Sequence, residues 1–273
     1  MPDFSLLLLL LLIVGAILAF AWPYYRLKQA ISRPFPSEWR RILQRNLLVY
    51  RRMPSDLQRQ LQRLIKQFLH EKQFSGHAGL SMTDEMRVTI AASACLLLLN
   101  RRTSVYSGLR YILVYPNAFV AREESMDETG LASHRLRGLL GQSWSNGKVI
   151  LSWEDVLQGS RNFRDGKNVA LHEFAHQLDH ESGATNGAPF LGSRARYHRW
   201  ASALTAEFET LQRAAFQGDA TLLDHYGATE PAEFFAVITE TFFEQPVEMA
   251  AEHPALFDEL KGYYRVDPRE WLD

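Results

Sequence analysis

The feature that most constrains this chain is the motif His172-Glu173-Phe174-Ala175-His176, which lies inside an otherwise apolar run. Histidines four residues apart project from nearly the same face of an α-helix, so both imidazoles can reach one ion. Zinc accepts such a pair at roughly 2.0–2.1 Å per nitrogen. Glu173 points about 100° around the helix from His172, where its carboxylate can reach a water molecule without binding the metal. The motif therefore predicts a buried helix over residues 168–180 that carries two zinc ligands and a general base.

A catalytic zinc ion needs a third protein ligand and one open position. His180 follows His176 by four residues, but about 12 Å of helix rise separates it from His172, which is too far for both to bind one ion. Glu233 is the better candidate, because it lies in the first turn of a second predicted helix, residues 231–243, where an ionised carboxylate is favoured. The sequence thus points to two histidines and one glutamate as the metal ligands.

Two further acidic residues each have two possible roles. Glu240 lies on the same helix face as Glu233, two turns along, so it either orients a ligand imidazole or makes a structural hydrogen bond. The same alternatives hold for Asp179, which follows His176 on the motif helix. The sequence supplies no obvious fourth ligand, and this favours an open catalytic site over a closed structural one.

The amino-acid composition limits the possible domain organisation, the classes of ligand and the types of metal site. The 273 residues, of which 47% are hydrophobic, can form either one large domain or one domain with an appendage. The formal net charge is −1, so no basic excess exists to neutralise phosphates, and direct nucleic-acid binding is not expected. The single cysteine, Cys95, excludes an internal disulfide and cysteine-based zinc sites.

Residues 1–25 are predicted to form a transmembrane anchor. Residues 4–22 carry no charge and would span roughly 28 Å as a helix, close to the ~30 Å of a hydrocarbon core. A secretory signal peptide is the competing interpretation, but Asp3 precedes the apolar run where a signal peptide has positive charge. Basic residues follow the run instead, which predicts an outside N-terminus and a cytoplasmic catalytic domain. We therefore expect a single-pass protein of the cell (inner) membrane that contacts the lipid bilayer through residues 4–22.

Hydrophobic spacing predicts a mainly helical α+β fold after this anchor, with a linker over residues 26–37 and one domain over residues 38–273. Further helices are expected over residues 38–52, 56–74, 83–100 and 193–216. Strands are expected over residues 110–115 and 118–120, and an Asn-Gly turn suggests a hairpin that pairs residues 136–143 with 148–152. Residues 121–135 and 181–192 are predicted loops. The small sheet would lie beside the motif helix, where an edge strand can pair with an extended peptide.

Three stretches together carry a family resemblance: HEFAHQLD at residues 172–179, Tyr226, and PAEFFAV at residues 231–237. With them, the chain closely resembles the zinc-dependent peptidases of the Mlc titration factor A family over roughly residues 38–270. The resemblance implies a zincin-like metallopeptidase domain. It also implies a transcriptional-regulator partner, although the N-terminal apolar segment departs from the soluble members of the family.

The resemblance assigns a role to each matching residue. It implies that His172, His176 and Glu233 bind Zn²⁺, that Glu173 is the general base, and that Tyr226 steadies the oxyanion. For Tyr226 the alternative is a tyrosine packed in a loop. Short peptides or free N-termini are the implied substrates, which corresponds to aminopeptidase-like action.

The predicted function is therefore zinc-dependent hydrolysis of a peptide or protein substrate by a metal-activated water, with Glu173 as the base. The alternative is a membrane-tethered regulatory or peptide-binding protein with a non-catalytic zinc site. A closed set of four protein ligands would distinguish the second from the first.

Overall fold

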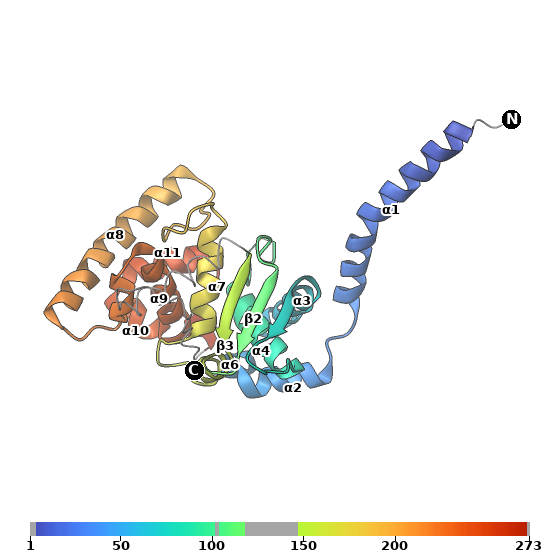
Figure 1. Ribbon diagram of the computed structural model, residues 1–273. Coiled ribbons are helices and arrows are strands. Elements are labelled where there is room, and N and C mark those ends of the chain that lie inside the picture. Colours follow the sequence, from blue (N-terminus) through green and yellow to red (C-terminus); the bar gives the residue numbers. More distant parts are fainter. Residues whose placement is uncertain (1–3, 102–103, 118–146, 272–273) are drawn as a thin grey trace, which may run out of the picture.

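The computed structural model of the chain describes residues 4–101, 104–117 and 147–271 (Figure 1). Helices dominate these residues, and three strands form one small sheet. The expected fold class, mainly helical α+β with a small sheet beside the motif helix and an apolar N-terminal helix, is confirmed.

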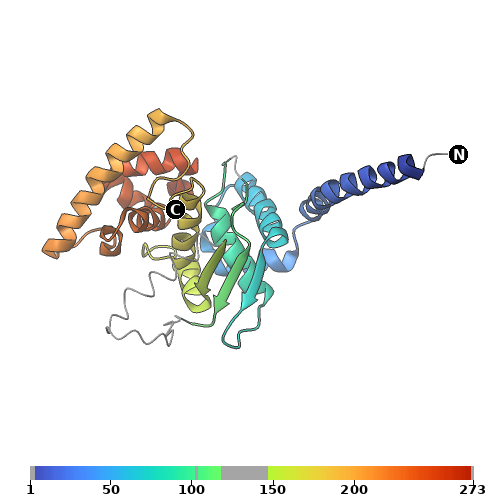
Figure 2. The ribbon, with the colours of Figure 1, turned by 45° about the horizontal axis from the view of Figure 1, so that its top comes forward.

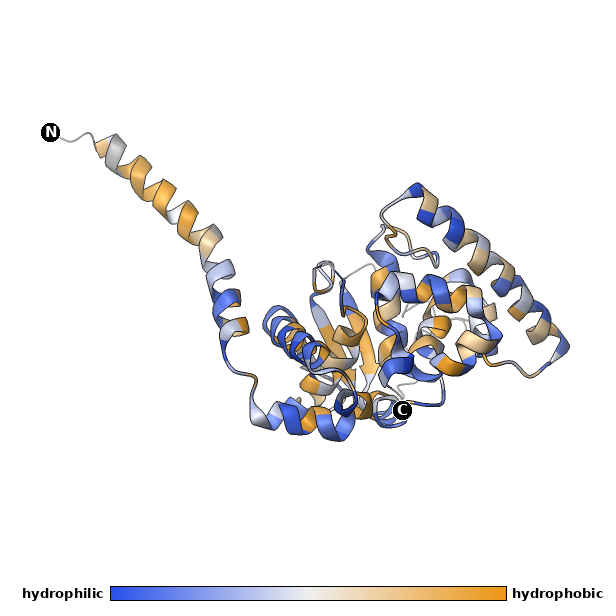
Figure 3. Ribbon diagram, turned by 180° about the vertical axis from the view of Figure 1, so that it is seen from behind, coloured by the Kyte–Doolittle hydropathy of each residue, from blue (hydrophilic) through white to orange (hydrophobic). Residues whose placement is uncertain are grey.

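Helix α1 (Phe4–Ser32) projects away from the body of the molecule as a single rod (Figure 1). Its outer part is strongly hydrophobic, whereas its last turns are polar (Figure 3). Residues Leu8–Ser32 form a helix long and apolar enough to cross a membrane, although a signal sequence passes the same test. The helix includes residues 26–32 of the expected linker, so only residues 33–36 separate it from the next helix. Lys66 donates hydrogen bonds to the carbonyls of Ile31 and Arg33, which ties the end of α1 to the body.

The first helices of the body are α2 (Ser37–Asn46), η1 (Leu48–Arg51), α3 (Ser55–Glu71) and α4 (Asp84–Leu96). The helix predicted over residues 38–52 therefore divides at Leu47, and the hydroxyl of Thr83 caps α4. The prediction of helix as far as Phe74 was wrong. Lys72 has extended backbone angles, and the Gln73 N–H donates to the carbonyl of Arg110 at 2.9 Å, so the chain enters a strand here.

The sheet consists of β1 (Gln73–Gly76), β2 (Tyr111–Tyr115) and β3 (Lys148–Ser152), which run parallel in this order (Figure 2). Strands β2 and β3 were predicted within one residue, but β1 was not. The expected strands at residues 118–120 and 136–143, the loop at residues 121–135 and most of the Asn-Gly turn lie outside the described residues.

The C-terminal half contains mainly helices. These are α6 (Trp153–Arg161), α7 (Val169–His180), α8 (Arg194–Gln217), η2 (His225–Ala228), α9 (Pro231–Glu244), α10 (Pro246–Glu252), α11 (Pro254–Tyr264) and η3 (Pro268–Trp271). Helix α7 lies between the sheet and the helices α8 to α11 (Figures 1 and 2). The α-helices α6, α10 and α11 and the short 3₁₀ helices η2 and η3 were not predicted. The motif helix is therefore the central element that both halves contact.

An aromatic cluster joins α7 to the first half of the body. The ring centroid of Phe174 lies 5.7 Å from that of Phe68 and 5.3 Å from that of Tyr106. All three side chains are fully buried. Aromatic pairs at these separations add to the stability that burial of apolar area provides. The cluster thus fixes the motif helix against α3 from the side opposite to its histidine face.

We expect Phe174→Ala to lower the free energy of unfolding by about 3–5 kcal/mol, because it removes a large buried side chain and leaves a cavity. Phe216, which is 94% exposed at the end of α8, offers a matched control. Phe216→Ala should change stability by less than about 0.5 kcal/mol. Urea titration followed by circular dichroism measures both variants, and equal losses would contradict the role of the cluster.

Candidate metal centre

Three predicted ligand side chains converge at the centre of the molecule. The Nε2 atoms of His172 and His176 are 3.2 Å apart. The Oε2 atom of Glu233 lies 2.9 Å from the first nitrogen and 3.5 Å from the second. One ligand atom from each residue lies within 4.8 Å of the other two, which makes them a group able to hold a metal ion.

Local sequence explains why α7 and α9 present these side chains. Asn168 caps α7, because its side-chain oxygen accepts a hydrogen bond from the Leu171 N–H at 3.1 Å. Pro231 occupies the start of α9, where the missing N–H costs nothing, and Glu233 follows in the first turn. Apolar residues on the remaining faces of both helices bury them against the core. The two helices pack together, and their facing sides carry the polar group.

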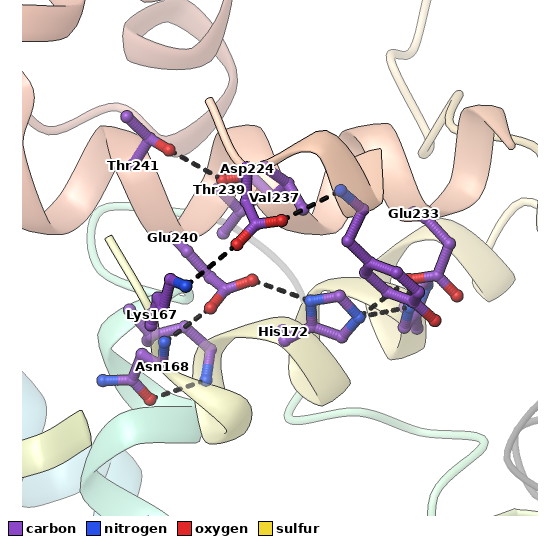
Figure 4. A network of polar contacts seen from close by, with 12 residues as sticks. Lys167, Asn168, His172, Asp224, Glu233, Val237, Thr239, Glu240 and Thr241 are labelled. Atoms are coloured by element: carbon purple, nitrogen blue, oxygen red, sulfur yellow. Dashed lines mark hydrogen bonds and ion pairs between the residues drawn. The ribbon is translucent and has the colours of Figure 1, made fainter. Parts of the chain in front are cut away.

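The imidazole of His172 is held between two carboxylates of α9 (Figure 4). Its Nδ1 atom lies 2.7 Å from Oε1 of Glu240, and its Nε2 atom lies 2.9 Å from Oε2 of Glu233. With a proton on Nδ1, the ring donates a hydrogen bond to Glu240, and the Nε2 atom, which faces Glu233 and His176, can then offer its lone pair to a metal ion. This contact favours the orienting role over a purely structural one for Glu240.

These residues fit a metal ion. Two imidazole nitrogens and a carboxylate oxygen are acceptors, and their convergence in a buried place requires a cation or a proton between them. Neighbouring ligand atoms around a tetrahedral zinc ion, at bond lengths of 2.0–2.2 Å, are about 3.3–3.5 Å apart. The distances of 2.9, 3.2 and 3.5 Å found here lie close to that range. The donor set of two nitrogens and one oxygen is also one that catalytic zinc sites use.

The pKa values of these groups reflect the same concentration of negative charge. Burial alone lowers the pKa of His172, but hydrogen bonds to Glu233 and Glu240 outweigh burial and raise it well above the ordinary value. Burial alone raises the pKa of Glu233, but hydrogen bonds with both histidines hold it well below the usual range. Burial lowers the pKa of His176 to about 4. A site that stabilises a proton on His172 this strongly can stabilise a cation in its place.

Glu173 and Tyr226 lie beside the ligands. Both line a cavity of about 430 Å³ that His172 also lines. The Glu173 side chain is buried, with 5% of the residue exposed, and the ring centroid of Tyr226 lies 5.9 Å from that of His172. A second cavity, of about 780 Å³, is lined by α8 and the loop before it, and none of the five predicted ligand and catalytic residues lines it. The smaller cavity is therefore the one that can bring a substrate to the ligand group.

Asp179 and His180, which were also considered as site residues, lie further along α7. Asp179 accepts a hydrogen bond from the Gly187 N–H at 2.7 Å, and Gly187 packs so closely on the carbonyl of Pro231 that an added Cβ would lie 2.4 Å from it. Asp179 therefore fastens the loop after α7 to the start of α9, which favours the structural alternative. His180 is 3.2 Å from the hydroxyl of Thr185 and is not part of the ligand group.

Two residues that position the motif helix, Asn168 and Glu244, were not predicted from the sequence. The Asn168 N–H donates to Glu240, and the Asn168 side-chain amide donates to Glu244 at 3.0 Å. The backbone N–H of Lys167 also donates to Glu244, at 3.2 Å. Asn168 could have been found, since an asparagine before an apolar run is a typical helix start. Nothing in the sequence identifies Glu244, because its partners lie more than 70 residues away.

Comparison with known proteins decides the family. The model of the glucose-regulated metallo-peptidase M90 family matches residues 22–265, which is most of the chain. The chain belongs to this family. It is 39% identical over 266 residues to an uncharacterized protein of Synechocystis, covering 95% of this chain and 97% of that protein.

Other relatives are more distant. The Mlc titration factor A of Klebsiella pneumoniae (strain ATCC 700721) is 32% identical over 252 residues, covering 91% of this chain and 92% of the relative. The Mlc titration factor A of Serratia proteamaculans is 35% identical over 217 residues, with 77% and 82% covered. The M90 family and these relatives confirm the resemblance inferred from the motifs.

We expect Glu240→Ala to weaken metal binding roughly 10–100-fold, because His172 would lose the carboxylate that orients its ring. Glu248→Ala, at an exposed position of α10, is the control and should bind metal as the wild type does. Competition with a chelator of known affinity measures the change, and circular dichroism checks the fold. Unaltered metal affinity in Glu240→Ala would refute the orienting role.

Asp179 should make stability depend on pH. Burial raises its pKa to about 6, although N–H groups of residues 186–188 partly offset the effect. The folded protein therefore binds this proton more tightly than the unfolded chain does, so its contribution to stability is complete below about pH 4 and is lost as the pH rises through 6. In Asp179→Asn this loss should be absent. Urea titrations of both forms at several pH values from 4 to 7 give the difference, and parallel pH profiles would contradict the assignment.

Proposed function

We propose that this member of the M90 family is a zinc-dependent peptidase in which Glu173 is the general base. The observation that carries the proposal is the position of Glu173, a buried carboxylate that lines the same cavity as the ligand histidine next to it in sequence. A purely structural metal site has no need of a carboxylate at this place. The family description supports the class of reaction.

His172, His176 and Glu233 would hold the zinc ion, and His172 lines the cavity that Glu173 and Tyr226 also line. When bound, zinc supplies a Lewis acid that polarises a peptide carbonyl and lowers the pKa of a water molecule towards about 7. Glu240 would keep the His172 ring in the tautomer that directs Nε2 to the ion. These three ligands and their orienting carboxylate come from only two helices, α7 and α9.

Glu173 would accept the proton of the attacking water and transfer it to the leaving amine. The carboxylate is ionised when it accepts this proton, and the carboxylic acid so formed gives the proton to the amine, which restores the carboxylate. Tyr226 would donate a hydrogen bond to the oxyanion that develops on the carbonyl. Its ring lies over the same cavity, beside His172, and η2 fixes its backbone through the 2.9 Å hydrogen bond from the Tyr226 N–H to Asp224.

We further propose aminopeptidase-like action on peptides with a free N-terminus, by analogy with the family resemblance. A cavity of about 430 Å³ has the size of sites that hold small ligands, and the free end of a peptide is a ligand of that size. The name of several relatives says that they titrate Mlc, so a regulatory protein is proposed as a partner on that name alone. The apolar helix supports a proposed single-pass anchor in the cell membrane, with the catalytic domain in the cytoplasm.

The test compares the wild type with Glu173→Gln. The variant keeps the shape of the side chain but cannot accept a proton, so kcat should fall roughly 10²–10⁴-fold. Zinc content should stay near one ion per chain, because Glu173 is not among the proposed ligands. Metal analysis and cleavage of a peptide library measure the two quantities on the same samples.

Glu209→Gln, at an exposed position of α8, is the matched control and should behave as the wild type. Peptides with free and acetylated N-termini separate the two parts of the proposal, since only the free form should be cleaved. Full turnover by Glu173→Gln would remove Glu173 as the base. Zinc in both forms with cleavage in neither would favour the alternative of a peptide-binding protein.

A further inference from the structure

A third hollow, which none of the candidate metal ligands lines, has an unusual concentration of positive charge. It has a volume of about 500 Å³ and is lined by Arg51, Arg52, Arg161 and Arg164. Arg51 ends η1 and Arg52 follows it, whereas Arg161 ends α6 and Arg164 lies in the segment after α6. Among the described residues no aspartate or glutamate lines it. In a chain whose formal net charge is −1, such a grouping is not a consequence of general basicity.

Two of these guanidinium groups donate hydrogen bonds to uncharged acceptors. Arg51 Nε donates to the carbonyl of Gln44 at 2.6 Å, and Arg161 donates to the side-chain oxygen of Asn46 at 3.2 Å. These contacts orient both side chains without neutralising their charge. A hydrogen bond from Asn46, and to a smaller extent the charges of Arg45 and Arg161, lower the pKa of Glu85, and Glu85 forms its ion pair with Arg45 at 2.8 Å. The structure thus holds positive charge in place beside the hollow.

A structural explanation covers only part of this arrangement. Arg161 lies in the last turn of α6, where a cation is favoured by the helix dipole, and its bond to Asn46 links α6 to α2. This accounts for one arginine. Arg164 follows the helix, is exposed, and has no acidic partner in the described part of the chain. Neither helix stability nor ion pairing explains why its side chain lines the same hollow as Arg51 and Arg161.

The floor of the hollow is apolar and aromatic. Phe163 and Trp271 line it, and both are buried. The indole N–H of Trp271 has no hydrogen-bond acceptor among the described residues, although buried donors usually have one. A volume of about 500 Å³ lies within the range of small-molecule sites, which combine apolar walls with a few oriented polar groups.

We propose that this arginine-lined hollow binds a small ligand that joins a phosphate group to a ring or another apolar body. Arginine guanidinium groups form paired, charge-assisted hydrogen bonds with phosphate oxygens. A group of three or more arginines suits a phosphate dianion as its ligand better than it suits a carboxylate, which has a single negative charge. The aromatic floor would contact the apolar body of the ligand. The site is separate from the metal centre, because none of its lining residues lines the cavity of His172 and Glu173.

The test is calorimetric titration of the full chain in detergent micelles with phenyl phosphate, inorganic phosphate and phenol. We expect phenyl phosphate to bind with a Kd of about 1 mM or tighter, and inorganic phosphate at least about fivefold more weakly. Phenol at the same concentrations should give no signal. Equal binding of the two phosphates would leave no role for the aromatic floor and would contradict the ring-bearing ligand class.

Two variants locate the binding. Arg164→Gln and Arg51→Gln should each weaken phenyl phosphate binding at least fivefold, since each removes one charged donor. Arg213→Gln, an exposed arginine of α8 outside the hollow, is the control and should bind as the wild type does. Circular dichroism confirms that all variants fold. Binding that persists unchanged in both test variants would place the anion elsewhere, such as at the metal centre, and would overturn the proposal, as would no binding by the wild type.

Discussion

The structure depends on the packing of α7 against α9, which places one imidazole between two carboxylates. Glu233 and Glu240 are seven residues apart, so they lie on one face of α9 and two turns from each other. His172 bridges that interval, with Nε2 directed to the first carboxylate and Nδ1 to the second. A shift of either helix by one residue along the other would move Glu233 or Glu240 out of contact with His172. The aromatic contacts of Phe174 on the opposite side of α7 resist such a shift, so the core and the site fix the same register.

The start of α7 is held by the same facing helix. Asn168 caps α7 with its side-chain oxygen and uses its amide to contact Glu244, one turn beyond Glu240 on α9. Burial raises the pKa of Glu244 to about 9, although Asn168 partly offsets the effect, so this carboxyl group is neutral near pH 7. Successive carboxyl groups along α9 therefore act differently. Glu233 stays ionised beside the histidines, and Glu244 works as a neutral hydrogen-bonding group that positions the helix start.

Local sequence patterns predicted the features that lie within a single helix. They did not predict the features that depend on a contact with a segment distant in the sequence. Spacing four residues apart identified His172 and His176, and the first turn of a helix identified Glu233. Strand β1 was missed because Gln73–Gly76 has no apolar run and is a strand only through its pairing with Tyr111–Val114 of β2. Helix α6 was missed although Ser152, followed by two acidic residues, is a typical helix start. The role of Glu244 could not be predicted, since it exists only when α7 and α9 meet.

The buried carboxyl groups of α9 affect the stability of the fold as well as the candidate metal centre. Glu233, Glu240 and Glu244 are all buried on one helix, and an ionised carboxylate is stable in such surroundings only with a compensating charge or several donors. Glu244 is neutral, so it needs hydrogen-bonding partners but no compensating charge. Glu240 has hydrogen-bonding partners in the His172 ring and the Asn168 N–H. In the part of the chain that the structure describes, Glu233 pairs with His172 and His176, and of these two His176 stays neutral at pH 7 because burial lowers its pKa to about 4. A divalent cation would supply more positive charge to this group than the proton on His172 does, so its binding free energy would add to the stability of the α7–α9 packing.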